Sequence, residues 1–132
     1  MNAIFAKNVG TLELLDSIQK GLAFSLFEEV VKHYQFTMTD LAAVVGMSPR
    51  TLARRKIEKK LSQSESDRLV SVVRLLTQSA ELFEEDLEKA NHWLNTPNRG
   101  LGGHTPWQIA QTETGSREVE QLIGRLENGV FS

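Results

Sequence analysis

Apolar residues recur at intervals of three and four along almost the whole chain, and the strict alternation typical of strands is scarce. This spacing predicts a succession of amphipathic helices, because side chains three and four residues apart share one face of an α-helix. The first apolar stripe spans residues 12–18 and is expected to end at Gly21. The second spans residues 24–31, with His33 and Tyr34 near its end. The fold is therefore expected to be all-α.

Residues 38–57 fit a helix-turn-helix, in which two short helices cross around a tight turn and share a small core. Gly46 is expected to make the turn, because glycine adopts backbone conformations that strain other residues. Ser48 followed by Pro49 predicts the start of the second helix, with a serine cap and a proline in the first turn. The residues expected to fill the shared core are Leu41, Ala42, Val45, Met47, Leu52 and Ile57.

A long helical pattern begins at Ser62, which fits a capping box with Glu65. Apolar spacing continues well beyond it, and a break near Glu84 is expected to divide the pattern into two helices. Further on, a short helix is predicted to end at Gly115, and Ser116 is predicted to cap the last helix. The buried stripe of that helix is expected to be Val119, Leu122, Ile123 and Leu126.

The stretch NHWLNTPNRGLGGHTP, residues 91–106, is unlike an ordinary linker. Pro97 is expected to stop the preceding helix, and three glycines let the backbone turn sharply. Thr105 then fits a capping box with Gln108, and Pro106 suits the first helical position. A rigid loop between two helices is more typical of a binding surface than of a spacer. The residues assigned to the core around it are Trp93, Leu94 and Trp107.

The formal net charge of -2 over 132 residues hides an uneven distribution. Residues 37–60 carry six basic and two acidic side chains, whereas residues 77–132 carry four basic and nine acidic ones. A basic segment joined to an acidic one suggests two different partners, one of them a polyanion, although solvated helix faces account for the asymmetry equally well. The domains are expected to be an N-terminal helical region, 1–76, with the helix-turn-helix at about 38–60, and a small C-terminal helical domain, 77–132.

The basic segment is interpreted as a DNA reader, because the second helix of a helix-turn-helix lies in the major groove and presents its N-terminal residues to base edges. Arg50 and Arg54 share one helical face, and each could hold a guanine through two hydrogen bonds. Arg55 stands where such motifs often carry an aliphatic residue. The residues predicted to face bases are Ser48, Arg50, Ala53 and Arg54, and those predicted to meet phosphates are Arg55, Lys56, Lys59 and Lys60. A helical hairpin that merely packs is the alternative.

Composition narrows the remaining possibilities. The chain has no cysteine, no long apolar run and no signal-peptide pattern at its start, so a cytoplasmic protein without a membrane span is expected. His33, His92 and His104 stand far apart and do not form a metal-binding pattern. The acidic residues 84–86 lack the apolar surroundings that acid catalysis requires. We expect neither an enzyme nor a cofactor.

Two sequence blocks, RTLARRKIEKKLSQSESDRL and WLNTPNRGLGGHTPWQIAQTETGSREVEQLIGRLENGVF, resemble the Xre-type antitoxins of RES-Xre toxin-antitoxin systems, which are similar to the MbcA and ParS antitoxins. The resemblance covers about Thr39 to Phe131, and the WL, PN, LGG, TP, TxxG and RLxxGVF elements occur in the family's order. Trp107 stands where the family more often has an aliphatic residue. Residues 1–36 match less distinctively.

The resemblance implies an antitoxin without catalytic groups, whose N-terminal helix-turn-helix represses its own operon and whose C-terminal domain silences a RES-domain toxin. Such toxins consume NAD, and the antitoxin is expected to cover their NAD-binding cleft. Phe131 is the sharpest anchor candidate, because an exposed aromatic side chain near a terminus suits an interface, although it could equally fold back onto its own core. The residues predicted to bind the toxin are Asn98, Arg99, Leu101, Gly102, Gly103, Arg125, Glu127, Asn128, Val130, Phe131 and Ser132.

Expected partners are a cognate RES-domain toxin, operator DNA and a second copy of the chain, because helix-turn-helix proteins commonly pair to reach two half-sites. The rival interpretation is a stand-alone transcription regulator whose C-terminal domain only dimerises or senses a small ligand. The sequence leaves open the operator, the stoichiometry, the toxin's exact chemistry, the residues that enter its cleft, and whether toxin strengthens or weakens repression.

Overall fold

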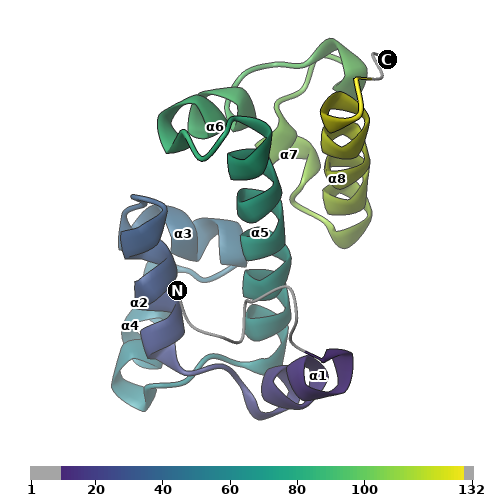
Figure 1. Cartoon of the computed structure of the whole chain (residues 1–132). Helices are drawn as coiled ribbons and strands as arrows, with labels where there is room; N and C mark the ends of the chain where they lie inside the picture. The colour runs from purple at the N-terminus through teal and green to yellow at the C-terminus, as the bar shows by residue number, and fades with distance from the viewer. Residues whose placement is uncertain (1–9, 130–132) are drawn as a thin grey trace. The chain divides into compact units, whose positions relative to one another are not determined.

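The computed structural model describes residues 10–129, and the chain divides after Val73 into two compact units, 1–73 and 74–132. The all-α prediction is confirmed: within residues 10–129 the regular elements are helices, and β-structure is limited to two isolated bridges. In chain order the elements (Figure 1) are α1 (Thr11–Lys20), α2 (Phe24–His33), α3 (Met38–Val45), α4 (Pro49–Glu58), α5 (Gln63–Leu82), α6 (Leu87–Leu94), the 3-10 helix η2 (Arg99–Leu101), α7 (Pro106–Ile109) and α8 (Glu113–Glu127).

The first unit is built around α2, α3 and the N-terminal half of α5. In it, α3 packs against both α2 and α4 (Figure 1). Phe27, Val30 and Leu41 are inaccessible to solvent, and the Phe24 and Phe27 rings lie with their centroids 5.4 Å apart. Burial of such large apolar side chains is the main stabilising contribution to a small domain. The remaining core residues of this unit are Ile18, Leu22, Leu26, Tyr34, Ala42, Val45, Met47, Leu61, Leu69, Val70, Val72 and Val73.

The helix-turn-helix prediction is confirmed in its local geometry. Gly46 ends α3 with φ 94° in the left-handed region, where a side chain would be strained. The Ser48 hydroxyl accepts a hydrogen bond from the Thr51 amide at 3.2 Å, and Pro49 begins α4. One core assignment is wrong: Ile57 is 82% exposed, and no residue of α4 is fully buried. Ile57 lies in the last turn of α4, where residues 56–60 are all exposed, so the core does not extend over this end of the helix.

The second unit contains the C-terminal half of α5 together with α6, α7 and α8, and α7 packs against both α6 and α8 (Figure 1). The predicted break is confirmed: Glu84 and Glu85 have φ of 54° and 67°, α5 ends at Leu82, and the Asp86 carboxylate caps α6. Leu94 is fully buried, as predicted, but the Trp93 and Trp107 rings are only half-buried. The core residues here are Leu75, Leu76, Ala80, Ala90, Leu94, Pro106, Ala110, Val119, Leu122 and Ile123.

The start of the last helix differs from the prediction. The cap is Thr112, whose hydroxyl accepts the Gly115 amide at 3.0 Å, so Gly115 and the buried Ser116 belong to the first turn of α8. Gly115 does not end α7. It stands where the Ile109 carbonyl comes so close that an added Cβ would overlap its oxygen. The glycine is therefore explained by a close backbone approach between α7 and α8.

None of the helices between residues 10 and 129 combines the length and the apolar character that crossing a membrane would require.

Candidate functional site

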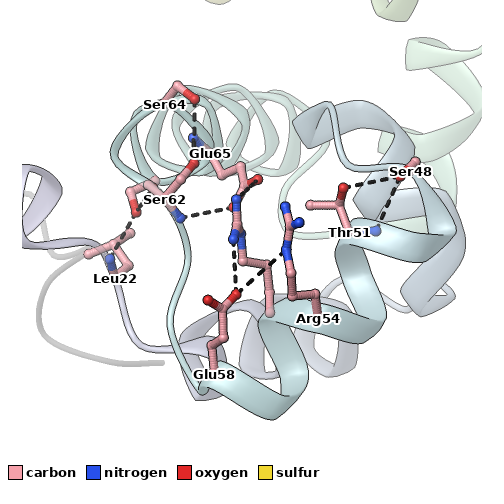
Figure 2. Close-up of polar contacts among 10 residues, drawn as sticks. Leu22, Ser48, Thr51, Arg54, Glu58, Ser62, Ser64 and Glu65 are labelled. Atoms are coloured by element: carbon pink, nitrogen blue, oxygen red, sulfur yellow. Dashed lines mark hydrogen bonds and ion pairs between the residues drawn. The ribbon is translucent and has the colours of Figure 1, made fainter.

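The four residues predicted to face bases lie exposed at the N-cap and in the first two turns of α4. Ser48 caps this helix and also lies 3.1 Å from the Thr51 hydroxyl, so the first turn is held by two side-chain hydrogen bonds (Figure 2). Arg54 has an exposed side chain that lies 3.8 Å from the Glu58 carboxylate, a loose surface pair that a phosphate or a base could displace. Arg50 and Ala53 are exposed as well. This face is therefore accessible to a ligand.

Three of the four residues predicted to meet phosphates are also exposed: Lys56 on α4, Lys59 at its C-cap, and Lys60 just beyond. Lys59 has φ 63°, a left-handed conformation that ends the helix. The Phe24 amide donates to the Lys59 carbonyl at 3.1 Å, and the Leu61 amide donates to the Leu22 carbonyl at 2.9 Å. These bonds tie the lysine-bearing segment to the chain between α1 and α2, so its backbone is held in place.

The fourth residue, Arg55, requires a correction. Its guanidinium Nε and Nη2 donate to the two Glu65 carboxylate oxygens at 2.7 and 3.1 Å, and its Nη1 donates to Glu58 Oε1 at 3.0 Å. The side chains of Arg55 and Glu65 are only 18% and 11% exposed. Three of its five N–H groups are used inside the protein, so this geometry does not support the predicted phosphate contact of Arg55.

The ion pair affects the pKa values of both its members. Hydrogen bonds from Arg55 to Glu65 and Glu58 raise the pKa of the guanidinium above its usual value. Burial alone would raise the pKa of Glu65, but the hydrogen bonds from Arg55 and from the Ser62 amide outweigh it and lower that pKa. Both groups are therefore charged at neutral pH. In the sequence, the only sign of this ion pair is Arg55 itself, a basic residue where an aliphatic one is common. The fold is needed to identify Glu65 as its partner.

The glycine loop at residues 98–103 is closed by its own hydrogen bonds. The Asn98 amide donates to the His104 carbonyl at 3.0 Å, and the Gly103 amide donates to the Asn98 carbonyl at 3.0 Å. The Asn98 side chain accepts the Gly100 amide at 2.8 Å, and Gly102 has φ 67°. Arg99, Gly102 and Gly103 are exposed, whereas Asn98 and Leu101 are half-buried. Loops held in this way lose little conformational entropy when a partner binds.

Three of the other residues predicted to bind a toxin, Arg125, Glu127 and Asn128, lie at the end of α8. Glu127 and Asn128 are exposed, and the Asn128 side-chain amide donates to the Gly124 carbonyl at 2.9 Å. Arg125 is half-buried, and its Nε is buried without a hydrogen-bond partner in the described part of the chain. Among residues 10–129, no hydrogen bond or ion pair joins this group to the glycine loop. Val130, Phe131 and Ser132 lie outside the described residues.

A hollow of about 560 Å³ beside α6 was not anticipated from the sequence. The Phe83 and Trp93 rings form part of its wall, with their centroids 6.3 Å apart. Asp86, Glu88, Lys89, His92 and Thr96 complete the lining. The half-buried state of Trp93, which the sequence assigned to the core, is explained by this hollow.

Glu120 on α8 is half-buried, and its Oε1 is buried without a hydrogen-bond partner among the described residues. Burial raises its pKa, partly offset by the charge of Arg74. An acid whose pKa is raised by folding stabilises the fold in its protonated form below the unfolded pKa. That contribution is lost as pH rises through the folded pKa.

Glu120→Gln is therefore expected to raise the melting temperature at pH 7, because glutamine carries no charge to desolvate. Near pH 4, where Glu120 is itself largely protonated, the gain should shrink. Thermal unfolding followed by circular dichroism measures both. Glu118→Gln, at an exposed position on the same helix, is the matched control and should change little. An equal gain in both variants would show that overall charge, not burial, is responsible.

Among residues 10–129, no three histidine, aspartate or glutamate side chains gather in an arrangement that could hold a metal ion.

Comparison with known proteins assigns both halves of the chain. Residues 13–74 match the family described as the antitoxin Xre-like helix-turn-helix domain, and residues 78–129 match the antitoxin Xre/MbcA/ParS C-terminal toxin-binding domain. A protein named Antitoxin Xre from Yersinia enterocolitica is 36% identical over 120 residues, which are 90% of this chain and 81% of that protein. An Antitoxin Xre from Photorhabdus laumondii is 34% identical over 87% of this chain and 78% of its own length. A third, from Pseudomonas putida, is 32% identical over 89% of this chain and 72% of its own length.

Proposed function

The chain belongs to the Xre antitoxin family, and on that premise we propose that it neutralises a RES-domain toxin and represses its own operon. In this proposal the protein is the antitoxin of a type II toxin-antitoxin system and acts in the cytoplasm. It has no catalytic activity of its own. The observation that carries the proposal is the division of the chain into a unit with an exposed basic helix and an acidic unit with a preformed loop.

For the DNA-binding half, the support is the exposed face of α4. Arg50 and Arg54 supply guanidinium groups in the first two turns of the proposed recognition helix, and Lys56, Lys59 and Lys60 add positive charge along its far end. Lysines that neutralise phosphates release counterions, so operator affinity should fall steeply as salt rises. We propose that the chain binds as a homodimer, which would place two such helices on successive half-sites.

For the toxin-binding half, the support is the acidic C-terminal unit and its glycine loop. We propose that the loop at residues 98–103, the end of α8 and the tail at residues 130–132 cover the NAD-binding cleft of the toxin. The loop's internal hydrogen bonds fix its shape before any partner arrives. Phe131 supplies an aromatic side chain of the kind that anchors interfaces. Inhibition would then need only occlusion of the cleft.

The direct test is co-expression with a RES-domain toxin from the adjacent reading frame, with purification of the pair and measurement of cellular NAD. We expect the two proteins to purify together and NAD to stay at its normal level. Depletion of the antitoxin should then lower NAD. If no such toxin binds and NAD is unaffected, the toxin-binding half of the proposal is wrong, and a stand-alone regulator becomes the better interpretation.

Deletion of residues 129–132 is expected to weaken toxin neutralisation, because it removes Phe131 from the interface. The loss should amount to about 2 kcal/mol of binding, or roughly 30-fold in affinity, as for one aromatic anchor. Titration of toxin activity with truncated antitoxin measures it. The truncated protein must still melt cooperatively at the wild-type temperature. A marked fall in that temperature would indicate instead that the tail packs on its own core.

A further inference from the structure

We propose that Glu65 is a positioning residue for DNA recognition: by holding Arg55, it fixes the orientation of α4 and so the base edges that Arg50 and Arg54 reach. The inference rests on the proposed operator binding. It concerns a carboxylate that touches no DNA and whose charge, taken alone, opposes DNA binding.

The first observation is that packing constrains α4 weakly. None of residues 49–58 is fully buried; Thr51 and Leu52 are half-buried, and Ile57 is exposed. A helix normally gains a fixed orientation from an apolar stripe that interlocks with its neighbours. Here the stripe is short, and the contact with the most specific geometry is the two-fold hydrogen bonding between Arg55 and Glu65. Paired hydrogen bonds between a planar guanidinium and a carboxylate fix direction as well as distance.

The second observation is that Glu65 is itself firmly held. It lies in the first turn of α5, and its Oε1 also accepts the Ser62 amide at 2.9 Å, while the Ser62 hydroxyl accepts the Glu65 amide at 3.2 Å (Figure 2). Next to it, the buried Ser66 hydroxyl accepts the Leu22 amide at 2.8 Å. Because the capping box anchors the carboxylate to α5, any constraint on Arg55 is passed from the core to α4.

Removal of the Glu65 charge should change DNA affinity in opposite directions, depending on whether Arg55 contacts phosphate or Glu65 positions α4. If Arg55 were a phosphate contact, removing the Glu65 charge would release the guanidinium and lower the negative charge beside DNA, and affinity would rise. If Glu65 positions α4, the same change lets the helix shift. Bidentate base contacts tolerate only small displacements, so sequence-specific affinity would fall.

The decisive variant is Glu65→Gln in the full-length chain, because glutamine keeps an oxygen for the Ser62 amide and loses the ion pair. The probes are a duplex that the wild-type protein selects from a random-sequence library and a scrambled duplex of the same composition. We expect affinity for the selected duplex to fall about 10- to 100-fold, equivalent to one or two weakened base contacts. Affinity for the scrambled duplex should stay equal or rise slightly.

Arg55→Lys provides an independent variant that keeps the positive charge but not the paired hydrogen bonds. It should lose discrimination between the two duplexes as Glu65→Gln does, and the double variant should be no worse than either single one. Lys56→Gln is the matched control on the same helix. It should weaken both duplexes alike and lower the salt slope by about one.

Selected-duplex affinity that is unchanged or higher in Glu65→Gln, with Arg55→Lys behaving like wild type, would overturn the positioning role. Should Glu65→Gln fail to melt cooperatively, Arg55→Lys provides the test instead, through its ratio of affinity for the selected duplex to affinity for the scrambled duplex. A wild-type protein that enriches no duplex at all would instead refute the operator-binding proposal, and the positioning role with it.

Discussion

Gly115→Ala is expected to destabilise the C-terminal unit by about 2 to 3 kcal/mol, because a methyl group at this position would overlap the Ile109 carbonyl oxygen. The added Cβ would also lie 2.8 Å from the Ile109 carbonyl carbon and 3.1 Å from the Thr112 hydroxyl oxygen. These are backbone and capping atoms at the junction of α7 and α8, so their displacement would disrupt the first turn of α8 and its Thr112 cap. Thermal unfolding should show a melting temperature lower by roughly 10 °C.

The matched control is Gly124→Ala in the same helix. Apart from the backbone of α8 itself and the two chain neighbours, no atom of residues 10–129 lies within 4 Å of a Cβ built on Gly124, and its position in the interior of α8 favours alanine by about 0.5 to 1 kcal/mol. The same chemical change should therefore raise stability at one position and lower it at the other. Two variants that shift the melting temperature in the same direction would refute the close approach described for Gly115.

Replacing both Arg50 and Arg54 with alanine is expected to abolish most sequence-specific DNA binding. Each arginine that holds a guanine through two hydrogen bonds contributes about 1 to 3 kcal/mol, so the double variant should lose on the order of 100-fold in affinity for a selected duplex. Both side chains are exposed, and no residue of α4 is fully buried, so folding should be little affected. Competition binding against a scrambled duplex measures the effect.

Lys59→Gln distinguishes contacts with bases from electrostatic attraction to the phosphate backbone, which does not depend on DNA sequence. A lysine that meets phosphate should weaken binding to all sequences by a similar factor and lower the salt slope by about one. The arginine variant, by contrast, should reduce the ratio of selected to scrambled affinity. If both variants change that ratio equally, or if neither weakens binding, α4 is not the recognition helix.

Sequence signals between near neighbours in the chain predicted the ends of several helices. Local signals worked well: Gly46, Ser48 with Pro49, and the Thr105–Gln108 capping box all have the predicted geometry. Each involves residues at most four apart, so backbone stereochemistry and one or two hydrogen bonds decide the outcome. The Ser116 cap failed because Thr112 offered a competing hydroxyl, and the approach of Ile109 to Gly115 decided between them.

Burial was harder to predict than helix position. Ile57 and Leu52 both fit the helical stripe of α4, yet Ile57 is exposed and Leu52 only half-buried. Trp93 fits the stripe of α6 but borders a hollow. Periodicity shows which side chains share a face, and it does not show how far a neighbouring element extends over that face.

The amino-acid order alone determined where most helices start and stop, the separation of basic from acidic segments, and the motifs of the antitoxin family. These follow from contacts between near neighbours and from composition. Only the tertiary structure decided that Arg55 is held by Glu65, ten residues away, and that Gly115 must admit the carbonyl of Ile109. Such contacts join different helices, and their geometry exists only after the helices have packed.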